Sequence, residues 1–227
     1  MTGPTRDGTV TCVRNGPCCP RCAEPVHPPG LRASGWTCPA HGQVPPFQPP
    51  HPPSAAWLAD VARRSTVPVW VPWPLPRGWL LSGVGEAGAA RQGPVATVVA
   101  VSGPNPTPNP AVPGEHPADV LLVAESPGVG LGASLAGLGD VDPGETVVTG
   151  RPDVKVHAHG QHTPLWHVDG AGGRAAFVGE SRGVWLWVLV WPASASALLL
   201  EPLELVDVRE GGPALFPPTG AACPRLT

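Results

Sequence analysis

Residues 184–191 read Val184-Trp-Leu-Trp-Val-Leu-Val-Trp191, the longest apolar run in the chain, and Pro192 follows it. A membrane-spanning helix needs about 20 apolar residues, so this run is too short to form one. Because polar residues do not alternate with apolar ones along it, we expect a β-strand that is covered on both faces. The glycine-bounded stretch Gly179-Glu-Ser-Arg-Gly183 precedes it and predicts a hairpin turn.

Other short apolar segments surround this run, and Gly, Pro and Asn separate them. The candidate strands cover residues 79–84, 95–102, 119–125, 154–159, 164–168, 174–179, 184–191 and 203–209. In the fourth of them, Val154, Val156 and Ala158 alternate with Lys155, His157 and His159, which predicts one buried face and one solvated face. Residues 67–79 are too rich in proline for a central strand and are expected along a sheet edge or across a sheet face.

A helix is expected at residues 55–64, because Ser54 can cap its start and Arg63 and Arg64 suit its C-terminal end. The small number of helical segments argues against a doubly wound fold. We therefore predict an α+β, mostly β fold, in which an N-terminal zinc-ribbon-like knuckle precedes an antiparallel sheet domain with one or two short helices.

The composition divides the chain into three parts. Residues 1–42 contain five of the six cysteines and form the zinc-ribbon-like segment. Residues 43–53 read QVPPFQPPHPP, which favours an extended polyproline II linker. Residues 54–227 are predicted to form the antiparallel β-rich domain, with the short helix at its start and a flexible tail at its C-terminus.

The overall composition indicates a folded chain. The 227 residues include 29 Gly and 34 Pro, but 42% are hydrophobic and nine are Trp, which argues against disorder. The net charge of −3 and the absence of a basic block argue against nucleic acid and membrane surfaces as partners. The polar start, residues 1–11, lacks a signal-peptide core, so we expect a cytoplasmic protein whose cysteines bind metal before they form disulfides.

The cysteine spacing predicts a zinc site. Cys19-Pro-Arg-Cys22 and Cys38-Pro-Ala-His41 are two pairs of ligands with 15 residues between them. Three thiolates and one imidazole complete a tetrahedral Zn²⁺ site, and a closed site of this kind is structural rather than catalytic. We therefore expect one structural Zn²⁺ and no catalytic or cofactor-binding residues. Cys18 is an alternative first ligand, in a less regular spacing.

The two pairs resemble zinc-ribbon knuckles, which read C-P-x-C-G. Ala23 stands where glycine is usual, and His41 replaces the last cysteine, but neither change removes a ligand. Three Trp-rich stretches extend the resemblance over most of the chain: VWVPWPLPRGW at 69–79, TPLWHV at 163–168 and GESRGVWLW at 179–187. Together with the knuckles they look like an actinobacterial family of unassigned function. Some members of that family are labelled phosphotransacetylase, which implies a transferase.

Three further motifs each permit a structural and a functional interpretation. Residues 128–133 match the dinucleotide fingerprint G-x-G-x-x-[GA], although only a short glycine-broken segment follows. Ser181 lies in a G-x-S-x-G pattern, but a strand-like segment without histidine follows it, which favours a hairpin over a hydrolase site. Four histidines form a cluster in the sequence: His157, His159, His162 and His167. With Asp169 or Glu180 as an added carboxylate ligand, this cluster is either a second metal site or the solvated face of a strand.

These observations favour a non-catalytic zinc-binding protein that serves as a protein- or ligand-binding module. The Trp70, Trp73 and Trp79 segment either fills the core or forms part of a recognition surface. The alternative is an enzyme, which would be metal-dependent through His157 and His159 or an acyl or phosphate transferase, as the family label implies.

Overall fold

A computed structural model describes the chain over residues 16–31, 33–108, 117–138, 143, 150–170 and 172–226. In these residues the chain forms a nine-stranded sheet and a separate two-stranded hairpin. The hairpin consists of β1 (Thr37–Cys38) and β2 (Gly42–Gln43). The strands of the large sheet are β3 (Trp70–Pro72), β4 (Leu80–Ala87), β5 (Ala96–Gly103), β6 (Ala118–Glu125), β7 (Val154–Ala158), β8 (Gln161–Val168), β9 (Ala175–Ser181), β10 (Val184–Trp191) and β11 (Glu204–Asp207).

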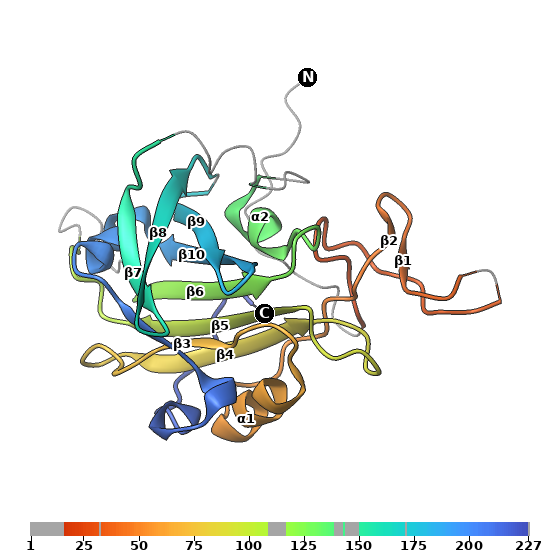
Figure 1. Ribbon diagram of the computed structural model, residues 1–227, viewed down its shortest axis with the longest axis horizontal. Helices are drawn as coiled ribbons and strands as arrows, with labels where there is room; N and C mark the ends of the chain where they lie inside the picture. Colours follow the sequence, from red (N-terminus) through yellow and green to blue (C-terminus); the bar gives the residue numbers. More distant parts are fainter. Residues whose placement is uncertain are drawn as a thin grey trace.

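The strand order in the large sheet is β3-β11-β7-β8-β9-β10-β6-β5-β4. All neighbouring strands are antiparallel except the β7–β11 pair, which is parallel; β11 is antiparallel to its other neighbour, β3. The sheet is strongly curled, since β3 at one end of the order packs against β5 and β6 near the other end (Figure 1). The predicted mostly β fold with an antiparallel sheet is therefore confirmed, and the parallel β7–β11 pair is an addition to it.

Strand β10 lies at the centre of the structure and is covered on both faces, as its unbroken apolar sequence predicts. Trp187, Leu189 and Trp191 contribute to the core that faces the second helix. The alternate side chains of β10, Leu186, Val188 and Val190, point into the core enclosed by the curled sheet, which also contains Trp70 and Trp79. Successive side chains of a strand point to opposite faces, so β10 supplies both cores at once.

Two α-helices flank the sheet (Figure 1). Helix α1 (Ala55–Arg64) has the predicted bounds, and the Ser54 side chain accepts a hydrogen bond from the Trp57 amide at 3.1 Å. Its buried residues Leu58 and Val61 belong to a third core, which includes residues of β4. Helix α2 (Leu131–Ala136) is short and packs on the opposite side. The 3₁₀ segments are η2 (Ala193–Leu199), η3 (Val208–Glu210) and η4 (Pro213–Leu215).

The proline-rich segments lie at the edges of the sheet. The predicted edge segment contains β3, which is the last strand in the sheet order. The free edge of β4 is covered by both the proposed linker and the C-terminal residues. Phe47 in the linker is fully buried, and the Gln48 amide donates to the Glu86 carbonyl at 2.9 Å. The Cys223 amide donates to the Ser82 carbonyl at 2.8 Å. The division of the chain at residues 42 and 53 stays a prediction.

Within the described residues, none of the helices has the length and apolar content that a membrane span requires.

Candidate metal centre

The two knuckles are tight turns that bring four ligand side chains together. In the first, the Ala23 amide donates to the Cys19 carbonyl at 2.9 Å, which closes the turn. Ala23 has a φ of 61°, so it occupies the left-handed region usually taken by glycine, at a cost of roughly 1–2 kcal/mol. In the second, Gly42 has a φ of 68°, as its position after the last ligand predicts.

The ligand atoms of Cys19, Cys22, Cys38 and His41 all lie within 4.8 Å of one another. The Cys22 and Cys38 sulfurs are 3.7 Å apart. The His41 Nδ1 atom lies 3.5 Å from the Cys19 sulfur and 3.5 Å from the Cys38 sulfur. These four residues are therefore close enough to coordinate one metal ion. They form the only such group of three or more metal-binding side chains in the part of the chain that the structure describes.

The environment of the thiols differs from one cysteine to the next. Burial raises the pKa of the Cys19 thiol to about 12, against the opposing effect of the Arg21 and Cys22 amides. Burial also raises the pKa of the Cys22 thiol. At Cys38 burial acts in the same direction, but hydrogen bonds from the Ala40 amide and from His41 prevail and lower the pKa to about 7. Backbone amides therefore point at the sulfurs of Cys19, Cys22 and Cys38.

Cys18 is not available as an alternative ligand, because its sulfur forms a disulfide. This disulfide departs from the expectation that the cysteines are metal ligands or free thiols before they form disulfides. Cys18 is almost fully buried, and its backbone exchanges two hydrogen bonds with Phe47, at 2.9 and 2.8 Å. The other described cysteines are free thiols, and of the two alternative first ligands it is Cys19 that lies in the cluster.

The knuckles have little apolar core of their own. The buried residues around the ligands are Val26 and Val44, with Trp36 partly buried beside them. A side chain from the first knuckle also joins the segment to the loop before α2. The Arg21 Nε donates to the Val129 carbonyl at 3.2 Å, and its Nη2 donates to the Gly128 carbonyl. The sequence gives no signal for this contact, since the partners are more than 100 residues apart.

The dinucleotide-like motif has a structural role. At the start of α2, the Leu131 amide donates to Glu125 Oε2 at 2.7 Å and the Gly132 amide to Oε1 at 3.2 Å. The Trp187 indole donates to the same Oε1 at 2.7 Å, and Glu125 is 1% exposed. The carboxylate of the protein thus takes the place that a phosphate has in the dinucleotide motif. An acid at the end of an apolar strand, directly before a glycine-rich loop, is the sequence signal for this arrangement.

The pattern around Ser181 is a hairpin, as predicted. Ser181 ends β9 and pairs with Val184 of β10. Arg182 and Gly183 form the turn with φ values of 58° and 78°. Residues with positive φ at both central positions are typical of the two-residue turns that join antiparallel strands.

The four candidate histidines do not converge on one point. His157 Nδ1 is hydrogen-bonded to Glu204, and its Nε2 lies 2.8 Å from His162 Nδ1. His159 instead contacts Glu210, with Nδ1 3.1 Å from the carboxylate. His159 lies past the end of β7 with a φ of 53°, so the strand alternation that would place it beside His157 does not reach it.

The His167 Nδ1 atom lies 3.9 Å from the Asp169 carboxylate, apart from the His157–His162 pair. Glu180 accepts a hydrogen bond from the Gly183 amide at 2.8 Å. The two carboxylates proposed as added ligands therefore contact other groups than the His157–His162 pair, namely His167 and the Gly183 amide.

The Trp-rich segment serves mainly as core: Trp70 and Trp79 are buried, and Trp73 is partly buried against the third core.

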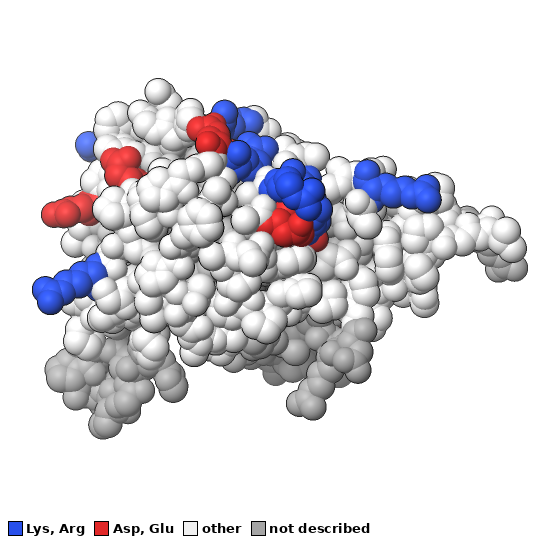
Figure 2. All heavy atoms as spheres, turned by 90° about the horizontal axis from the view of Figure 1, so that it is seen from below, with Lys and Arg blue, Asp and Glu red and all other residues white. Residues whose placement is uncertain are grey.

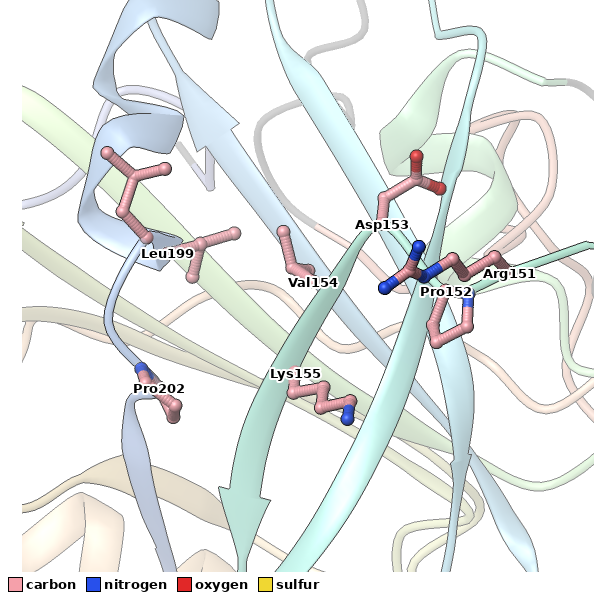
Figure 3. Close-up of a pocket in the computed structure, with 8 residues that line it drawn as sticks. Arg151, Pro152, Asp153, Val154, Lys155, Leu199 and Pro202 are labelled. Carbon is pink, nitrogen blue, oxygen red and sulfur yellow. The ribbon is translucent and has the colours of Figure 1, made fainter.

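A hollow of about 460 Å³ lies between β7 and the segment after η2 (Figure 3). Leu199 and Pro202 form one wall, and Val154 faces them. Arg151 and Lys155 bring two positive charges to the β7 side of the opening, and Asp153 brings one negative charge beside them. This lining differs from the thiol-rich cluster and shares no residue with it.

The comparison with protein families matches residues 13–226, which include both knuckles and the whole large sheet. Neither the curated proteins nor the solved structures give a match. The prediction that the chain resembles a family of unassigned function is therefore confirmed, and the match carries no information on activity. The chain belongs to the family of unknown function DUF6758.

Proposed function

We propose that Cys19, Cys22, Cys38 and His41 bind one structural zinc ion, in the manner of a zinc ribbon. The observation that carries this proposal is the spacing of the ligand atoms. With Zn–S distances of about 2.3 Å and a Zn–N distance of about 2.0–2.1 Å, a tetrahedral site has S–S edges of about 3.8 Å and S–N edges of about 3.6 Å. The S–S distance of 3.7 Å and the two S–N distances of 3.5 Å match these edges.

The ligand set selects the metal. Thiolates and imidazoles in a tetrahedral arrangement suit Zn²⁺, whereas Mg²⁺ and Ca²⁺ require oxygen ligands. Four protein ligands fill a tetrahedral shell and leave no position for substrate or a reactive water. The bound metal would replace the core that the knuckle segment lacks around Val26 and Val44.

We infer a non-catalytic module that binds a protein or a small ligand, and the closed metal site supports this inference. The hollow lined by Arg151, Asp153 and Lys155 is a concave candidate for a small amphipathic ligand, and its two positive charges against one negative charge favour an anionic group. Nucleic acid is a less suitable partner. The net charge is −3. The face in Figure 2 has few charged side chains, and positive ones lie among negative ones, so this face offers no basic patch for phosphates.

The rival function is an enzyme that uses His157 and His159, or a transferase as the label of related chains implies. The geometry gives less support to the first, since these two histidines contact different carboxylates, Glu204 and Glu210. A screen with acyl phosphates and coenzyme A addresses the second, and turnover there would replace the binding role.

Metal analysis by mass spectrometry tests the zinc site. The wild type should contain one zinc per chain, and Cys38→Ser should contain none. Cys223→Ser is the matched control, because Cys223 is a buried free thiol outside the cluster and its loss should leave the zinc in place. His41→Cys should also retain zinc, since it supplies a fourth thiolate, whereas His41→Ala should not. A metal-free wild type with freely titrating thiols would refute the proposal.

A further inference from the structure

Two histidines face each other on the solvent side of the β7–β8 hairpin. His157 and His162 are register partners in this antiparallel pair. The His157 Nε2 atom lies 2.8 Å from the His162 Nδ1 atom, and the two rings are close to perpendicular, at 81°. The His157 side chain is only 26% exposed, and His162 is exposed.

The third member of the group fixes the orientation of His157. The Glu204 carboxylate on β11 is hydrogen-bonded to His157 Nδ1, on the far side of the ring from His162. With the Nδ1 proton shared with the carboxylate, the Nε2 lone pair of a neutral ring points at His162. A carboxylate behind an imidazole, with the other ring nitrogen turned outward, is the usual second shell of a metal-bound histidine.

We propose that His157 Nε2 and His162 Nδ1 form a second metal site, which binds a divalent transition metal ion such as Ni²⁺, Cu²⁺ or Zn²⁺. The metal would replace the proton that the two nitrogens share. A metal–nitrogen distance of about 2.0–2.1 Å requires an N–N separation of about 3.3 Å in tetrahedral geometry. The rings therefore need to part by about half an ångström, and the exposed His162 can move by that amount.

The chemistry of the two ligands limits the choice of ion. Imidazole favours Ni²⁺, Cu²⁺ and Zn²⁺ over Mg²⁺ and Ca²⁺, which prefer oxygen ligands. Unlike the cysteine cluster, this site has only two protein ligands and leaves the remaining positions to water. It would hold an exchangeable metal, whereas the knuckles hold a permanent one.

The test is calorimetric titration of Ni²⁺ into the full-length protein with zinc in the knuckles. We expect one Ni²⁺ equivalent per chain in the wild type and its loss in both His157→Ala and His162→Ala. Glu204→Gln should weaken Ni²⁺ binding by about 10–100-fold, the effect of removing a second-shell partner. The matched controls are His167→Ala on the same hairpin and Glu210→Gln, which removes the partner of His159; both should bind Ni²⁺ as the wild type does.

His162→Gln provides a variant that keeps a polar side chain at an exposed position, so its loss of Ni²⁺ would not reflect unfolding. Zinc content and far-ultraviolet circular dichroism show that each variant retains the knuckle metal and the sheet. A wild type that takes up no Ni²⁺, or a His157→Ala, His162→Ala double variant that binds it unchanged, would overturn the proposal. Equal loss of Ni²⁺ in His167→Ala would overturn it as well.

Discussion

Replacement of Glu125 by alanine should destabilise the fold strongly, because its carboxylate is the common acceptor of three buried donors. These are the Leu131 and Gly132 amides and the Trp187 indole N–H, at 2.7, 3.2 and 2.7 Å. Glu125 is the last residue of β6, so it joins the sheet to the start of α2 and to β10. No solvent reaches the carboxylate in appreciable amount, since the residue is 1% exposed.

The expected loss follows from the donors that remain. Each buried donor without a partner costs about 1–3 kcal/mol, so three of them give a loss of at least about 3 kcal/mol in the free energy of unfolding. For a chain of this size, about 1 kcal/mol corresponds to about 2–4 °C in Tm, which predicts a decrease of at least about 6 °C. Water that enters the vacated space would reduce the loss toward this lower limit.

Urea unfolding followed by Trp fluorescence measures the change, because several of the nine Trp, Trp187 among them, are buried in the folded protein. Glu180→Ala is the matched control: Glu180 accepts one hydrogen bond in an exposed turn, and its removal should cost less than about 1 kcal/mol. A Glu125→Ala variant within about 1 kcal/mol of the wild type would refute the role assigned to this carboxylate. Retention of zinc in the variant would show that the effect is confined to the sheet.

Other perturbations test the attachment of the knuckles and the state of the thiols. Phe47→Ala should cost about 3–5 kcal/mol in urea unfolding, because this ring is fully buried against β4. Arg21→Ala should retain zinc but increase amide hydrogen exchange in residues 16–43, and unchanged exchange would contradict the docking role. In a maleimide labelling time course at pH 8, Cys223 should stay unlabelled until urea is added, because burial raises the pKa of its thiol to about 12. After chelation of zinc, Cys38, with its pKa of about 7, should react before Cys223.

The sequence predicts those parts of the fold that local patterns determine. The apolar run of β10 has no polar face because it lies between two cores, and the missing alternation of polar and apolar residues predicts this. Helix α1 has its predicted bounds because Ser54 caps one end and its apolar residues recur at helical spacing. The four metal ligands are also local, since each knuckle is a four-residue turn.

Contacts between distant segments are not predictable in this way. The Arg21 contact with the loop before α2 and the Glu125 contact with Trp187 join residues 107 and 62 positions apart. The choice between His159 and His162 as the partner of His157 depends on where β7 ends. The turn residue His159 leaves the strand with a positive φ, so alternation places it wrongly and the cross-strand register places His162 correctly.

The high proline content has a physical role at the edge of β4. An exposed edge strand offers amides and carbonyls to other chains, and this one is covered by two segments from opposite ends of the sequence. Prolines accept hydrogen bonds where they lie against the edge: the Leu81 amide donates to Pro218 at 2.8 Å and the Gly88 amide to Pro46 at 3.0 Å. Because proline has no amide to donate, these segments satisfy the edge of β4 but make poor templates for a further strand. The same residues that lower the helix content of the chain therefore end its sheet.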